Sequence, residues 1–176
     1  MEKLATKLRY MQFYAHNAHN MCKGDTFFSD HEELGGLYGT YEGLYDSIVE
    51  RMIGTGQTID LVKVQTEAVK MLDSDATPTD FNTAFNALLT CEQDLCKLIS
   101  DANEGASLGT QDLLQAMCND SEVRQYKFQQ RLSKYSAAKK ETDSKEDNTT
   151  GDTIEEKKEA TTKAKAVVVK LLTSKK

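Results

Sequence analysis

The chain has 176 residues, with 22 Lys and Arg against 28 Asp and Glu, and a formal net charge of −6. This length predicts one domain, and a hydrophobic fraction of 39% is enough for one buried core. Four Cys and ten Gly exclude a disulfide-rich scaffold and a collagen. No apolar run reaches the ~18 residues of a membrane-spanning helix, and the first residues lack the basic and then apolar build of a signal peptide, so we expect a cytoplasmic protein.

Five segments carry apolar residues at every third or fourth position, the spacing of one face of an α-helix. In chain order they are residues 2–22, 28–54, 59–72, 80–104 and 111–134. Glycines follow the second and the fourth segment, and the only Pro, Pro78, falls between helices. Four long helices, with a short one between the second and the third, predict an all-α, ferritin-like four-helix bundle.

The composition changes near residue 134, after which charged and small polar residues dominate. Residues 1–133 hold 11 Lys and Arg against 20 Asp and Glu, net −9, whereas residues 134–176 hold 11 Lys and 8 Asp and Glu, net +3. We therefore predict a bundle over residues 1–134 and a polar, Lys-rich, flexible tail over residues 135–176. The tail lysines suit DNA phosphates, and the apolar run at residues 166–172 suits docking to a partner or to the shell.

The histidines point to metal chemistry. All three lie in the first two predicted helices, where His19 falls at the edge of the apolar stripe and His16 further round. The second helix carries a polar ridge beside its own stripe, made of His31, Glu42, Asp46 and Glu50. Imidazole nitrogens with carboxylate oxygens suit iron and similar first-row metals. The residues alone leave open whether these are metal ligands or structural histidines beside a solvated acidic face.

The stretch from residue 11 to residue 56 resembles the Dps family, the miniature ferritins of starved bacteria. The resemblance is carried by His19, Lys23-Gly24, Phe27-Phe28, His31-Glu32, Leu37-Tyr38 and the run from Asp46 to Arg51, and it extends over about residues 4–133. The family pattern is two His, an acid four residues after the second, and then an Asp and a Glu. These positions are here His19, His31, Gly35, Asp46 and Glu50, so four of the five match. The Trp that commonly follows the first His is Asn20, and the tail is not part of the family core.

This resemblance implies a cage of twelve subunits with an iron-oxidising site between twofold-related chains. One chain would supply His19 and His31, and its neighbour would supply Asp46 and Glu50. The implied activity is that of a ferroxidase, which oxidises Fe(II) with hydrogen peroxide or oxygen, stores the ferric product inside the cage, and so protects against oxidative damage.

Gly35 is the main departure, because a missing carboxylate weakens an iron site. Glu42 is a candidate substitute across the twofold axis. The glycines at positions 35, 39 and 43 suggest instead a close approach of two second helices. The alternative function is an attenuated cage that acts mainly in DNA binding, or as an assembly protein, through its tail.

Two further features have open interpretations. Asp112 matches a family region that lines cation pores, and it equally suits the helix dipole as a first-turn acid. The cysteines are expected to be small helical residues of a reduced protein: Cys22, Cys91, Cys96 and Cys118. Because the spacing of Cys91 and Cys96 fits neither a zinc site nor a redox motif, we assign this pair no chemistry.

Overall fold

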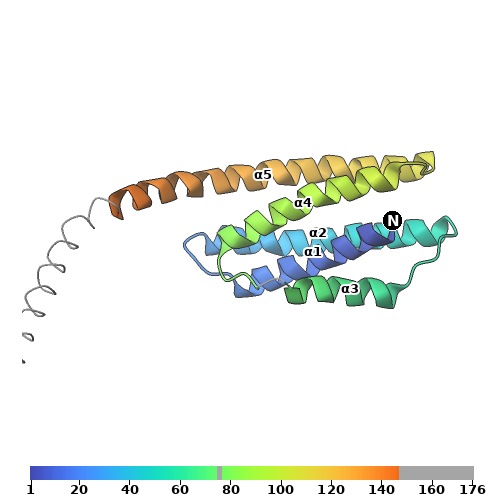
Figure 1. The fold of residues 1–176 in the computed structure, drawn as a ribbon, viewed down its shortest axis with the longest axis horizontal. Coiled ribbons are helices and arrows are strands. Elements are labelled where there is room, and N and C mark those ends of the chain that lie inside the picture. The colour runs from blue at the N-terminus through green and yellow to red at the C-terminus, as the bar shows by residue number, and fades with distance from the viewer. Residues whose placement is uncertain (75–76, 147–176) are drawn as a thin grey trace, which may run out of the picture. The chain divides into compact units, whose positions relative to one another are not determined.

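The computed structural model describes residues 1–74 and 77–146, and for residue 74 and residues 134–146 the backbone alone. The described residues form helices and no strand, which confirms the all-α prediction (Figure 1). The helices are α1 (Glu2–Met21), α2 (Phe27–Gly54), α3 (Leu61–Ser74), α4 (Phe81–Asn103) and α5 (Leu108–Glu146). The four long helices and the short α3 are those that the apolar periodicity predicts.

A single core lies within the compact unit Met1–Leu132. In this unit α1 packs against α2, α3 and α4, while α4 and the part of α5 up to Leu132 lie side by side (Figure 1). The largest fully buried side chains include Leu8, Leu34, Tyr41, Phe85 and Phe128, which come from four different helices. Burial of these side chains, at roughly 1.5–3 kcal/mol each, favours the bundle over isolated helices.

The start of α4 is fixed by a side-chain cap and by a link to the α1–α2 turn. Asp80 accepts a hydrogen bond from the backbone N–H of Thr83 at 2.9 Å, which satisfies one of the free donors of the first turn. The N–H of Lys23 donates to the carbonyl oxygen of Thr79 at 3.1 Å. These contacts join two loops that are more than fifty residues apart in sequence, and the first of these loops connects the two helices that carry the histidines.

α5 differs from its predicted bounds of residues 111–134. It begins at Leu108 and continues to Glu146, because the residues beyond position 134 include good helix formers and neither Gly nor Pro interrupts them before Gly151. The change in composition near residue 134 therefore does not end the helix. The remainder of the predicted tail, residues 147–176, lies outside the described residues. It contains the apolar run and the C-terminal lysines, so the DNA role stays a prediction.

The earlier start of α5 also changes the interpretation of Asp112. The first turn of α5 contains no acidic residue, since Asp112 is the fifth residue of the helix. A macrodipole partner must lie within the first turn, so that interpretation of Asp112 is wrong. Asp112 is exposed, and its pore role stays a prediction.

Candidate functional site

His19 on α1 and His31 on α2 face each other where the two helices meet at their connecting turn. Their ring centroids lie 3.7 Å apart with an angle of 22° between the planes. Nδ1 of His19 lies 2.9 Å from the carbonyl oxygen of His31, and Nδ1 of His31 lies 2.9 Å from the carbonyl oxygen of His19. Each imidazole is thus held by the backbone of the other helix.

This reciprocal pairing decides which nitrogen of each ring is available. A carbonyl oxygen only accepts hydrogen bonds, so each Nδ1 carries the proton and donates. Nε2 of each neutral ring then keeps its lone pair, which is the group that binds a metal ion. A hydrogen bond from the second ring nitrogen is also what orients metal-ligating histidines in proteins. The two half-buried side chains therefore present two oriented Nε2 donors.

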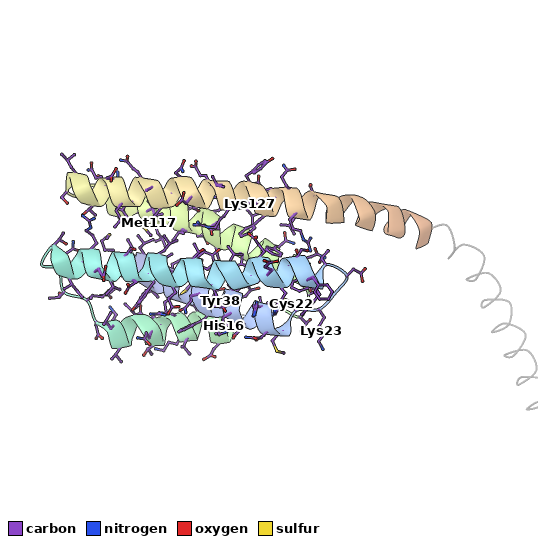
Figure 2. The ribbon with its side chains drawn as sticks, turned by 180° about the vertical axis from the view of Figure 1, so that it is seen from behind. His16, Cys22, Lys23, Tyr38, Met117 and Lys127 are labelled. Carbon is purple, nitrogen blue, oxygen red and sulfur yellow. The ribbon has the colours of Figure 1, made fainter. Side chains whose placement is uncertain are left out.

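Aromatic rings extend the histidine pair on both sides. Phe27 stacks on His31 with centroids 4.8 Å apart, and Tyr38 meets the edge of His19 at 5.5 Å. The exposed His16 packs on Tyr38 at 4.5 Å, and Figure 2 shows these two side chains next to each other on α1 and α2. The ring packing restricts rotation of the His19 and His31 imidazoles, and the hydrogen bonds from Nδ1 fix their orientation. Helical periodicity did not predict the contacts of Phe27 and Tyr38. It assigns each residue to a face of its own helix and does not identify the residue that it touches.

A buried carboxylate anchors the start of α2 next to the pair. Asp30 is 5% exposed and accepts hydrogen bonds from Arg131 of α5 and from the hydroxyl of Thr26. Arg131 also donates to the side-chain oxygen of Asn82 on α4 at 2.7 Å. The residue that precedes His31 is therefore tied to α4 and α5, which fixes the first turn of α2 and with it the histidine.

Gly35 lies directly against the candidate ligand His19. A Cβ atom at this position would lie 3.4 Å from Cε1 and 3.5 Å from Nδ1 of His19, which is ordinary van der Waals contact. A Cβ atom therefore fits at position 35, beside the histidine pair. By contrast, a Cβ atom at Gly36, Gly39 or Gly43 would meet nothing within 4 Å. Gly35 therefore borders the site, whereas Gly36, Gly39 and Gly43 leave the outer surface of α2 bare. The predicted close approach of two second helices stays a prediction.

The acids of the predicted ligand set lie elsewhere on the molecule. Glu42, Asp46 and Glu50 are exposed on α2, and the fifteen residues of helix between His31 and Asp46 span about 22 Å. Glu50 lines a hollow of about 420 Å³ together with Arg51, Thr55 and Leu113. Within the part of the chain that the structure describes, no three His, Cys, Asp or Glu side chains come together as a metal site. The predicted set is not assembled by one chain.

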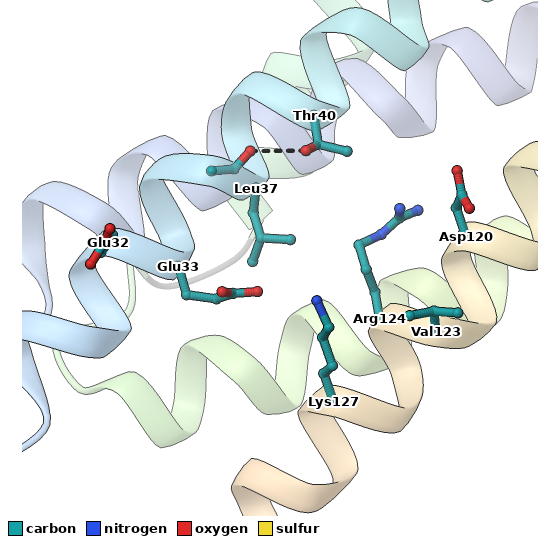
Figure 3. Close-up of a pocket in the computed structure, with 9 residues that line it drawn as sticks. Glu32, Glu33, Leu37, Thr40, Asp120, Val123, Arg124 and Lys127 are labelled. Carbon is teal, nitrogen blue, oxygen red and sulfur yellow. Dashed lines mark hydrogen bonds between the residues drawn. The ribbon is translucent and has the colours of Figure 1, made fainter.

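A groove between α2 and α5 offers carboxylates but neither imidazoles nor thiols. It has a volume of about 330 Å³ and is lined by side chains of both charges, among them Glu32, Glu33, Asp120, Arg124 and Lys127 (Figure 3). Lys127 and Arg124 project into it from α5. The basic side chains oppose the binding of a cation at this groove, and neither His nor Cys lines it.

The bundle interior contains a buried charge that is already neutralised. Glu92 on α4 is fully buried and accepts hydrogen bonds from Tyr41 at 2.7 Å, Ser121 at 2.6 Å and Arg124 at 2.6 Å. Burial, followed by the nearby carboxylate, raises the pKa of Tyr41 well above its ordinary value, so Tyr41 stays a neutral donor. Both carboxylate oxygens are occupied by protein donors.

The model of the ferritin-like domain matches residues 1–138 of the chain. The chain belongs to the ferritin-like family. None of the curated proteins compared with it matches it. Ferritin-like proteins bind iron, are generally associated with its storage and oxidation, and typically form oligomers. In this ferritin-like chain, no helix among the described residues is long and apolar enough to cross a membrane.

Because the chain is ferritin-like, the Glu92 cluster can be compared with the metal site of ferritin-like di-iron proteins. Ferritin-like di-iron proteins build their metal site inside the bundle from inward carboxylates and a Glu-x-x-His motif. In this ferritin-like chain the inward Glu92 is paired with Arg124, and no histidine of the sequence has a Glu three residues before it. A guanidinium occupies the place at which a cation would neutralise the carboxylate. The oriented donors of this chain are instead the Nε2 atoms of His19 and His31.

Proposed function

We propose that the chain is a Dps-like subunit of a twelve-subunit cage, which oxidises Fe(II) at a site shared between two chains and stores the ferric product. The observation that carries the proposal is the reciprocal pairing of His19 and His31, which leaves two Nε2 atoms free and oriented. The exposed position of Asp46 and Glu50 on the same helix supports their supply by a twofold-related neighbour.

The proposed iron ligands are of two kinds, neutral imidazole nitrogens and charged carboxylate oxygens. His19 and His31 would bind Fe(II) through neutral nitrogens, and Asp46 and Glu50 of the neighbouring chain would neutralise its two positive charges. Oxidation then removes one electron from each Fe(II). One hydrogen peroxide takes up two electrons and two protons, its O–O bond breaks, and two water molecules leave. Carboxylate oxygens favour the harder Fe(III) product, so the acids assist the oxidation step.

Gly35 sets the expected strength of this site. It stands beside His19 at the position where the family pattern has an acid, and it contributes no oxygen ligand. We therefore expect weaker iron binding than a complete ligand set gives. Glu42 lies on the same exposed side of α2 as Asp46 and is the candidate substitute from the neighbouring chain.

The proposal is tested by anaerobic Fe(II) titration followed by addition of hydrogen peroxide. The wild-type chain is compared with the double variant His31→Ala plus Asp46→Ala. The matched control is His16→Ala, because His16 is exposed and lies outside the hydrogen-bonded pair. We expect the double variant to lose fast oxidation and the control to retain it. Equal rates in the wild type and the double variant would overturn the ferroxidase proposal.

A further inference from the structure

Two cysteines that are far apart in sequence meet between α4 and α5. The sulfur atoms of Cys96 on α4 and Cys118 on α5 lie 3.3 Å apart, although 22 positions separate the two residues. Cys91, the nearer cysteine in sequence, is buried, and a five-residue step turns it by about 140° round α4 from Cys96. The two sulfurs in contact are therefore those of Cys96 and Cys118, and Cys91 lies on another side of α4.

Polar groups surround the sulfur of Cys96. The Cys118 thiol donates to it at 3.3 Å, and the side-chain N–H of Gln125 donates at 3.4 Å. The Cys96 thiol in turn lies 3.3 Å from the hydroxyl oxygen of Ser121, which also donates to the buried Glu92. Both cysteines are half-buried, so each keeps part of its surface exposed to solvent. The other two cysteines are buried.

We propose that Cys96 and Cys118 form an intrachain disulfide when the protein meets a hydroperoxide. In the first step the Cys96 sulfur attacks one oxygen of hydrogen peroxide and the O–O bond breaks. The products are a sulfenic acid on Cys96 and hydroxide, which takes up the proton released by the Cys96 thiol. In the second step the Cys118 sulfur attacks the Cys96 sulfur and the S–O bond breaks. The Cys118 proton leaves with that oxygen as water, so two thiols and one peroxide give one disulfide and two waters.

The order of the two cysteines follows from their surroundings. Burial raises the pKa of Cys118 to about 11, and the hydrogen bond to Cys96 acts in the same direction. Cys118 therefore stays a thiol near neutral pH, and thiols react with peroxide far more slowly than thiolates. Cys96, whose sulfur receives two donors, is the one that the peroxide oxidises, and Cys118 resolves the sulfenic acid.

The two sulfurs need only a short approach to form the bond. A disulfide has an S–S distance of about 2.05 Å, so they must come closer by about 1.3 Å. The bond would join α4 to α5 next to Ser121, and it would close the chain segment that contains the α4–α5 turn. Such a link restricts the unfolded chain, so the oxidised protein should melt at a higher temperature than the reduced protein.

The test uses the full-length chain, stripped of metal with a chelator so that iron chemistry plays no part. The protein is exposed to hydrogen peroxide, unfolded, and alkylated, and the modified cysteines are identified by mass spectrometry of intact chains and peptides. We expect alkylation of Cys22 and Cys91 alone and a peptide pair joined through Cys96 and Cys118. Treatment with dithiothreitol should restore alkylation of all four cysteines.

Variants separate the two steps. Cys118→Ser should prevent the disulfide and leave a sulfenic acid on Cys96 that dimedone traps, whereas Cys91→Ser should form the disulfide as the wild type does. Because the wild-type peptide map stands alone, misfolding of a variant does not decide the outcome. Alkylation of all four cysteines after peroxide, a cross-link between two chains, or oxidation of Cys96 to sulfinic acid without a disulfide would each overturn the proposal. Failure of the ferroxidase proposal leaves this result unaffected.

Discussion

His19 and His31 each donate a hydrogen bond from Nδ1 to the backbone carbonyl oxygen of the other, at 2.9 Å in both directions. The arrangement binds the end of α1 to the start of α2 and at the same time frees Nε2 of both rings. A contact that stabilises the turn therefore also prepares the metal donors. This double use means that a substitution at either histidine affects local structure as well as iron binding, and the experiments below include controls for that reason.

Subunit mixing tests whether the histidines and the acids act across two chains. Neither His19→Ala/His31→Ala nor Asp46→Ala/Glu50→Ala should oxidise iron rapidly when expressed alone. Co-expression of both chains in equal amounts should restore about a quarter of the wild-type rate, since half of the twofold pairs are mixed and each holds one intact site of two. Stopped-flow measurement of Fe(II) oxidation gives this rate. Activity that stays at the level of the separate variants would exclude a shared site.

Gly35→Asp should strengthen iron binding. The new carboxylate would stand beside His19, and the structure has room for its Cβ at 3.4 Å from the imidazole. We expect the Fe(II) dissociation constant from anaerobic titration to fall by about tenfold, the scale on which ligand-sphere changes act.

Two matched variants separate the carboxylate from the removal of a glycine. Gly36→Asp places the same side chain in open space one residue further along α2 and should leave iron binding unchanged. Gly35→Ala should stabilise the helix by about 0.5–1 kcal/mol without affecting iron. An equal gain in iron affinity from Gly35→Asp and Gly36→Asp would show that general negative charge, and not position 35, is responsible.

Glu92→Gln should destabilise the bundle strongly. The substitution removes the negative charge opposite Arg124, whose side chain is 11% exposed, and leaves that cation without its partner. Breaking a buried ion pair on one side costs about 3–5 kcal/mol in the free energy of unfolding, which urea denaturation measures. Lys97→Ala removes an exposed ion pair with Asp94 on the same helix and should cost at most about 1 kcal/mol. Similar losses in the two variants would contradict the burial argument.

Cys22 should make the protein less stable at alkaline pH. Burial, followed by the charges of Asp80 and Asp30, raises the pKa of Cys22 from 9.0 to about 11. Above pH 9 the unfolded chain loses this proton while the folded chain keeps it. The contribution of Cys22 to stability is therefore complete below pH 9 and is lost as the pH rises toward 11.

The measurement is the free energy of unfolding as a function of pH in the presence of a reductant. In this window Cys22→Ala should have a shallower slope than the wild type, by up to about 1.4 kcal/mol per pH unit for one proton. Between pH 6 and 8 the two slopes should coincide, even though the variant is less stable overall. Parallel curves across pH 9–11 would show that Cys22 titrates alike in both states.

The helices and their apolar faces were predictable because they depend on local spacing. Leu8, Leu34 and Phe85 recur with the helical period, and all three are buried in the core. The end of α5 was not predictable in the same way. The composition beyond residue 134 is typical of a tail and also of an exposed helix, and only the backbone distinguishes the two.

For the candidate site, the sequence by itself determined which residue types stand on which helix. His19 and His31 lie at the edges of two apolar stripes, and Asp46 follows about 22 Å beyond His31 along α2, with Glu50 one helical turn further. Only the tertiary structure decided what these side chains touch. Contacts such as those between the two imidazoles, between Glu92 and Arg124, and between Cys96 and Cys118 join residues on different helices. Helical periodicity fixes the direction of a side chain about its own axis, but it does not fix which helix lies opposite or at what height. That relative placement comes from packing of the whole core, and it gives the histidines their free nitrogens and the two thiols their contact.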